Sequence, residues 1–156
     1  ALDDERLADV LEELPEEDYV VPIGKAKIRR EGKDLTVITW GAMIYVAEEA
    51  AEELARDGVS MEIIDLRSIL PFDEEAILNS VAKTNRVVIL HEAPLTGGAG
   101  AEFAARIAEK AFDYLDAPIK RVAALDVPTP YSPPLEAFAL PNKAKLMTAV
   151  RELLKY

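Results

Sequence analysis

His91 and Glu92 are adjacent, and an imidazole beside a carboxylate can act as a general acid–base pair. They follow the apolar run at residues 86–90, which predicts that they lie at the end of a buried strand. Neighbouring strand residues point to opposite faces, so the two side chains are not expected to meet. His91 is also the only histidine, and no second imidazole can help it bind a metal. We therefore predict a structural or interface role for His91.

Asp65 and Arg67 lie two positions apart at the end of another apolar segment, on one side of the strand if it stays extended. This spacing predicts an ion pair that orders the loop leading to Pro71. The alternative is an arginine that binds a carboxylate of a partner.

The stretch Gly97-Gly98-Ala99-Gly100 precedes a predicted helix, where backbone N–H groups could bind an anion. It lacks both the Gly-Lys-Ser/Thr ending of a P-loop and the spacing of a dinucleotide fingerprint. Tight packing of the loop is therefore the favoured interpretation. The serines have no nucleophile-elbow context, and no carboxylate pair is singled out for acid–base work. The residues alone predict no catalytic, cofactor-binding or metal-binding site.

Short apolar runs alternate with amphipathic segments along the rest of the chain. Strands are predicted at residues 26–29, 35–40, 59–66, 86–90 and 119–125. Helices are predicted at residues 43–56, 73–83, 101–114 and 142–154, and four prolines predict an irregular loop over 127–134. This order indicates a three-layer α/β fold with a mainly parallel open sheet of about five strands and helices on both faces. Ligands or partners of such a sheet meet the loops at the carboxyl ends of the strands, here 40–42, 65–68, 91–98 and 126–131.

The net charge of −11 is concentrated at one end, since residues 1–18 carry nine acids and one base. Leucine and valine recur with a helical period over residues 3–14, which predicts an acidic helical appendage (1–14) before a single domain (15–156). This charge argues against nucleic acid and anionic membranes as partners. The absence of cysteine excludes disulfides and thiol chemistry, and no apolar run is long enough to span a membrane.

Six stretches follow one another in a specific order. They are Pro15-Glu-Glu-Asp-Tyr-Val-Val-Pro-Ile-Gly-Lys-Ala, Asp34-Leu-Thr-Val-Ile-Thr-Trp-Gly, Glu62-Ile-Ile-Asp-Leu-Arg-Ser-Ile-Leu-Pro-Phe-Asp, His91-Glu-Ala-Pro-Leu-Thr-Gly-Gly, Asp116-Ala-Pro-Ile-Lys-Arg-Val and Asp126-Val-Pro-Thr-Pro-Tyr. With a terminal helix and Tyr156, residues 15–156 resemble the C-terminal domain of 2-oxoacid dehydrogenase E1 β subunits, of branched-chain or pyruvate type. That domain has the transketolase C-terminal fold.

The resemblance implies a parent oxidoreductase that decarboxylates a 2-oxoacid on thiamine diphosphate and passes the acyl group to lipoyl-E2. It implies that thiamine diphosphate and Mg²⁺ are held by other domains, so this chain alone is expected to bind neither and to be inactive. The implied role is assembly: contact with other β chains, with the α subunit, and with the peripheral subunit-binding domain of E2, for which Tyr156 would supply a carboxylate. The interface candidates are Asp65, Arg67, His91, Glu92, Asp126, Tyr131 and Tyr156.

An exposed apolar patch would favour this assembly function, with Trp40, Met43, Ile44, Tyr45, Phe103, Phe112 and Tyr131 as candidates. Residues 1–14 depart from the family pattern, in which a pyrimidine-binding domain and a basic linker come first. The alternatives are therefore an excised or designed α/β scaffold without activity, and a stand-alone domain that binds a small anion. The expected location is the cytoplasm, or the mitochondrial matrix in a eukaryote.

Overall fold

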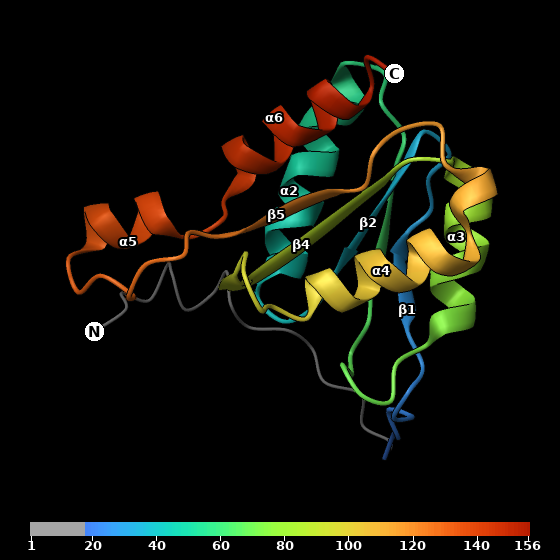
Figure 1. Cartoon of the computed structure of the whole chain (residues 1–156), viewed down its shortest axis with the longest axis horizontal. Helices are drawn as coiled ribbons and strands as arrows, with labels where there is room; N and C mark the ends of the chain where they lie inside the picture. The colour runs from blue at the N-terminus through green and yellow to red at the C-terminus, as the bar shows by residue number, and fades with distance from the viewer. Residues whose placement is uncertain (1–17) are drawn as a thin grey trace.

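The computed structural model describes residues 18–156, which form one sheet between two layers of helices (Figure 1). The strands are β1 (Lys27–Arg30), β2 (Leu35–Thr39), β3 (Met61–Asp65), β4 (Val87–Pro94) and β5 (Lys120–Ala124). The helices are α2 (Met43–Arg56), α3 (Glu74–Thr84), α4 (Gly100–Lys110), the short 3-10 helix η1 (Phe112–Tyr114), α5 (Pro133–Ala139) and α6 (Lys143–Leu153).

The five strands lie in the order β1-β3-β2-β4-β5. Strands β2, β3, β4 and β5 are parallel, and β1 is antiparallel to β3 at one edge. The centre is apolar and β-branched, and every residue of β2 and β3 is buried, as expected of parallel strands covered on both faces. The predicted α/β fold, with its mainly parallel sheet of about five strands, is confirmed.

Alternate residues of the central strands supply two separate apolar cores. Leu35 and Val37 pack with α2 and α6 on one face, whereas Ile38 packs with α3 and α4 on the other. Figure 1 shows these two helix pairs on opposite sides of the strands. Each face therefore has its own core, and the loops at the strand ends are anchored from both sides.

The predicted helix signals agree with the observed boundaries in two places. The predicted helix 43–56 has those bounds, and Asp73 caps α3 by accepting a hydrogen bond from the Ala76 N–H at 3.2 Å. Asn85 ends α3 in the left-handed conformation with φ of 61°, a role that asparagine can fill.

Three expectations were wrong in extent. Residues 127–134 were expected to be irregular throughout, but α5 begins at Pro133, because prolines in a first helical turn remove only N–H groups that lack helical partners. The strand expected over 86–90 continues to Pro94, and the helix expected over 101–114 ends at Lys110, before η1. The helix predicted at residues 3–14 lies outside the described residues.

Candidate functional site

His91 lies in the second half of β4, and its imidazole is fully buried. The ring stacks on Trp40 with 5.4 Å between the ring centroids. Neither ring nitrogen makes a hydrogen bond of good geometry within residues 18–156. Burial lowers the pKa of His91, the charge of Arg121 adds to the effect, and the nearby backbone of Ala93 opposes it only in part. The imidazole is therefore neutral near pH 7 and closed to substrate.

Two glycines make the space for this ring. A Cβ atom at Gly98 would lie 2.7 Å from His91 Cε1, and one at Gly100 would collide with His91 Nε2. Neither glycine has a positive φ, so the close approach, not backbone strain, requires a residue without a side chain. The interpretation of residues 97–100 as a tightly packed loop thus has a physical basis, and these packed glycines do not support the anion-binding alternative.

The loops after β4 and β5 are joined at Thr96 and Asp126. The Asp126 carboxylate accepts hydrogen bonds from the Thr96 N–H at 2.9 Å and from the Thr96 hydroxyl at 2.6 Å. These two bonds lower the pKa of Asp126, the hydroxyl having the largest effect, and the Arg121 guanidinium adds to it. Arg121 also donates to the Leu95 carbonyl at 2.8 Å. The structure therefore brings two of the predicted loops, 91–98 and 126–131, into one unit.

Asp65 and Arg67 do not form the predicted ion pair. The buried Asp65 carboxylate instead accepts a hydrogen bond from the backbone N–H of Arg67 at 2.9 Å. Arg67 has a positive φ of 57°, which ends the extended backbone and turns its side chain into solvent.

Glu92 is exposed whereas His91 is buried, so the side chains of His91 and Glu92 point apart, as the strand period predicts.

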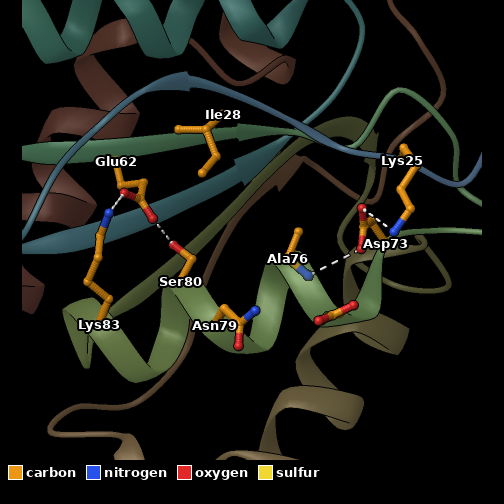
Figure 2. A pocket seen from close by; sticks show the side chains of 9 residues that line it. Lys25, Ile28, Glu62, Asp73, Ala76, Asn79, Ser80 and Lys83 are labelled. Atoms are coloured by element: carbon orange, nitrogen blue, oxygen red, sulfur yellow. Dashed lines mark hydrogen bonds and ion pairs between the residues drawn. The ribbon is translucent and has the colours of Figure 1, made fainter. Parts of the chain in front are cut away.

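A hollow of about 350 Å³ lies where β1 and β3 meet α3 (Figure 2). At one end lies Glu62, the second residue of β3, which is buried and is bound by Lys83 and by the hydroxyl of Ser80. At the other end Lys25 lies 3.5 Å from Asp73, the residue that caps α3. Figure 2 shows these two ion pairs at opposite ends, with Ile28, Ala76 and Asn79 between them.

The polar contacts of Glu62 continue into the core beneath the hollow. The Thr36 hydroxyl lies 2.6 Å from Ser80 Oγ and 2.7 Å from Thr84 Oγ1, and all three residues are buried. Gly32 N–H also donates to Glu62 at 3.2 Å. Glu62 and Asp73 are thus each already paired with a lysine. Among residues 18–156 no group of three or more His, Cys, Asp or Glu side chains could hold a metal ion.

The comparisons with known proteins agree with one another. Residues 24–146 match the family described as "Transketolase, C-terminal domain". The chain belongs to the transketolase C-terminal domain family.

Curated relatives of this family member are E1 β subunits. The chain is 44% identical over 146 residues to 2-oxoisovalerate dehydrogenase subunit beta 2, mitochondrial, of Arabidopsis thaliana, covering 94% of this chain and 40% of the relative. It is 45% identical over 145 residues to pyruvate dehydrogenase E1 component subunit beta of Staphylococcus aureus, covering 93% of this chain and 44% of the relative. The chain therefore spans less than half the length of these relatives, and their identities do not separate the two types.

A solved structure described as "Split gene transketolase, inactive beta4 tetramer" is also similar to this transketolase C-terminal domain. The TM-score is 0.77 at 27% sequence identity, and the match covers 93% of this chain and 46% of that chain. The fold of the family and the arrangement of strands described above therefore coincide.

The remaining interface candidates of this transketolase C-terminal domain lie far apart. Tyr131 is fully exposed in the segment before α5, and Tyr156 is exposed at the C-terminus, at the opposite end of the sheet (Figure 1). Of the apolar patch candidates, Met43 and Phe103 are core residues. Trp40 and Ile44 are partly buried, whereas Tyr45, Phe112 and Tyr131 are exposed.

Sequence reasoning missed two features of this domain. One is the row of exposed apolar side chains around α5, namely Leu125, Val127, Leu135 and Phe138. The other is the buried network of Glu62, Ser80, Thr36 and Thr84. A glutamate inside the otherwise apolar strand 61–64 was a usable signal for the second, because a buried carboxylate needs a partner.

Proposed function

We propose that this chain is the subunit-assembly and interaction domain of the β subunit of a thiamine-diphosphate-dependent 2-oxoacid dehydrogenase E1 component. The observation that carries the proposal is the apolar surface around α5. Tyr131 is fully exposed, and Leu135 and Phe138 are 57% and 67% exposed on the helix itself. Large apolar side chains gathered on one segment favour burial against a partner, because removing apolar surface from water is favourable.

The position of α5 supports the same proposal. Figure 1 shows α5 extending beyond the layer formed by α2 and α6. Its C-terminal end is held by Lys145, which donates to the Phe138 and Leu140 carbonyls. A helix that is fixed at its end but apolar on its outer side is suited to packing against another subunit.

The comparisons support a β-chain partner in particular. The similar split-gene transketolase chain is described as an inactive β4 tetramer, which is consistent with β chains that associate without producing activity. We propose other β chains as the main partners, with the α subunit and the E2 peripheral subunit-binding domain as further ones. The parent reaction would be oxidative decarboxylation of a 2-oxoacid with acyl transfer to lipoyl-E2.

We place thiamine diphosphate and Mg²⁺ in other domains of the parent enzyme. Two carboxylates of the hollow in Figure 2, Asp73 and Glu62, are paired with Lys25 and Lys83, so they are poor ligands for Mg²⁺. No helix within residues 18–156 is long and apolar enough to cross a membrane. We propose the cytoplasm, or the mitochondrial matrix in a eukaryote, as the location.

Sedimentation equilibrium of the full chain tests the assembly proposal. The wild-type chain should self-associate, and the double change Leu135→Ser with Phe138→Ser should weaken the association at least ten-fold. The matched control is Phe112→Ser with Tyr114→Ser on η1, at the other end of the domain (Figure 1), which should leave the dissociation constant unchanged. A wild-type chain that stays monomeric at about 1 mM, a weak-binding limit near −4 kcal/mol, would overturn the proposal.

Calorimetric titration with thiamine diphosphate and Mg²⁺ tests the cofactor part separately. No heat of binding is expected. A dissociation constant below about 100 μM, close to −5.5 kcal/mol, would show that this chain holds a cofactor site of its own.

A further inference from the structure

Strand β5 is an edge strand, since β4 lies on one side of it and no strand lies on the other among residues 18–156. The Ala124 carbonyl points toward β4, where it accepts a hydrogen bond from the Leu95 N–H at 3.0 Å. Because backbone direction alternates along a strand, the N–H and C=O groups of Arg121 and Ala123 point to the open side. Neither residue has a backbone partner on that side within the described chain. The open side ends at Leu125, whose N–H donates to the Ala139 carbonyl.

A groove runs along this open edge. Two hollows of about 300 and 450 Å³ lie beside β5, and both are lined by Arg121 and Lys145. The wall formed by α6 consists mainly of small residues, Ala144, Thr148 and Ala149. Both hollows lie beside the strand that carries the unpaired backbone groups.

The charge of the groove is positive at its centre. Arg121 and Lys145 form no ion pair within residues 18–156, and their hydrogen bonds go to neutral carbonyls. Lys120 lies at one end and is paired with Glu152 at 3.2 Å, and Asp126 lies at the other end. The local excess of cations favours binding of an acidic ligand in the groove. The net charge of −11 disfavours binding of such a ligand elsewhere on the chain.

We infer that the groove between β5 and α6 binds an extended acidic segment of a partner protein as a sixth strand of the sheet. The partner backbone would pair with Arg121 and Ala123, and its carboxylates would meet Arg121 and Lys145. Strand addition of this kind takes its affinity from main-chain hydrogen bonds and its selectivity from side chains at alternate positions. The five residues of β5 would pair with about four or five partner residues. The inference does not depend on the proposed assembly role.

The test is a titration of the isotope-labelled full chain with an eight-residue peptide of alternating glutamate and valine, followed by amide NMR. Shifts and slower hydrogen exchange are expected at Arg121 and Ala123. A peptide with lysine in place of glutamate should not bind. A glutamate peptide with alternate N-methylated amides should also fail, because it cannot complete the main-chain pairing.

Two variants identify the groove. Arg121→Glu should weaken binding at least ten-fold, whereas the matched change Arg30→Glu on the opposite edge strand β1 should not. Ala123→Pro removes an outward N–H at a position where an edge strand tolerates proline, and it should abolish binding. This second variant leaves Arg121 and its hydrogen bond to the Leu95 carbonyl in place, so it tests the groove independently of Arg121→Glu. Dissociation constants above about 1 mM, equal binding of the N-methylated peptide, or shifts centred on β1 would overturn the inference.

Discussion

Thr96 donates both its backbone N–H and its hydroxyl to the carboxylate of Asp126, at 2.9 and 2.6 Å. The two residues are 30 positions apart in the sequence, and this pair of bonds joins the loops that follow β4 and β5. Because these two hydrogen bonds join them, the two loops are expected to move together.

The first prediction concerns the hydroxyl of this pair. Thr96→Val keeps the shape of the side chain but removes the donor that most lowers the pKa of Asp126, so that pKa should rise toward its ordinary value of 3.8. Because the pKa of Asp126 is lower in the folded chain, its hydrogen bonds to Thr96 stabilise the fold fully above about pH 3.8. This stabilisation is lost as the pH falls through the folded-state pKa. Carboxyl ¹³C NMR titration measures the change. Thr129→Val in the same region is the control, and an unaltered pKa of Asp126 in Thr96→Val would show that the hydroxyl is not the cause.

The second prediction follows from the space that His91 occupies. Gly100→Ala places a methyl group against His91 Nε2 and should destabilise the domain by about 1–3 kcal/mol, the usual cost of overpacking. Ala105→Leu on the exposed side of α4 should change stability by no more than about 0.5 kcal/mol. Combining Gly100→Ala with His91→Ala should cost less than the sum of the single changes, because the ring is no longer in the way. Strict additivity in urea denaturation would count against this packing explanation.

The third prediction concerns pH. The folded-state pKa of His91 lies below its ordinary value of 6.5, so the unfolded chain takes up the proton first as the pH falls. The free energy of unfolding should therefore decrease below about pH 6.5, with a slope of at most about 1.4 kcal/mol per pH unit for one proton. His91 is the only histidine, so a slope in this pH range can be assigned to its imidazole. His91→Phe retains the stacking on Trp40 and should remove the slope in urea denaturation between about pH 7.5 and 5.5; a variant with the wild-type slope would refute the assignment.

The fourth prediction concerns the buried glutamate. Lys83→Met leaves Glu62 buried without its cation and should destabilise the domain by about 1–3 kcal/mol. Lys110→Met, which breaks a surface ion pair with Glu74, should cost about 1 kcal/mol or less. Adding Glu62→Gln to Lys83→Met should recover part of the loss, because a neutral amide replaces the unpaired carboxylate. Equal costs for the two lysine changes, measured by thermal and urea unfolding, would mean that the Glu62 pair is no more important than a surface pair.

The central elements could be predicted from the sequence because their signals are local. The apolar run 35–40 and the amphipathic period of 43–56 each fix one element without reference to the others. The end of β4 could not be found in this way. Its last residues, from His91 to Pro94, carry no strand period, and their extended form depends on pairing with β5, where Pro94 lies opposite Ala124.

The candidate site was less predictable, for the same physical reason. The pairing of Thr96 with Asp126 and the closeness of His91 to Gly100 depend on how loops meet after the strands are in register. The spacing of Asp65 and Arg67 suggested an ion pair, but the positive φ of Arg67 reverses the direction of its side chain. Helix α5 was missed because Pro133 and Pro134 were interpreted as barriers to a helix, although a first turn accepts both.

The alternation of β2 between two apolar cores also has a consequence for how sequences of this kind can diverge. Leu35 and Val37 are constrained by α2 and α6, while Ile38 is constrained by α3 and α4. Compensating substitutions can therefore accumulate on one side of the sheet without any matching change on the other. Two distant homologues could exchange a whole helix layer, together with every second residue of the strands, and keep both cores filled.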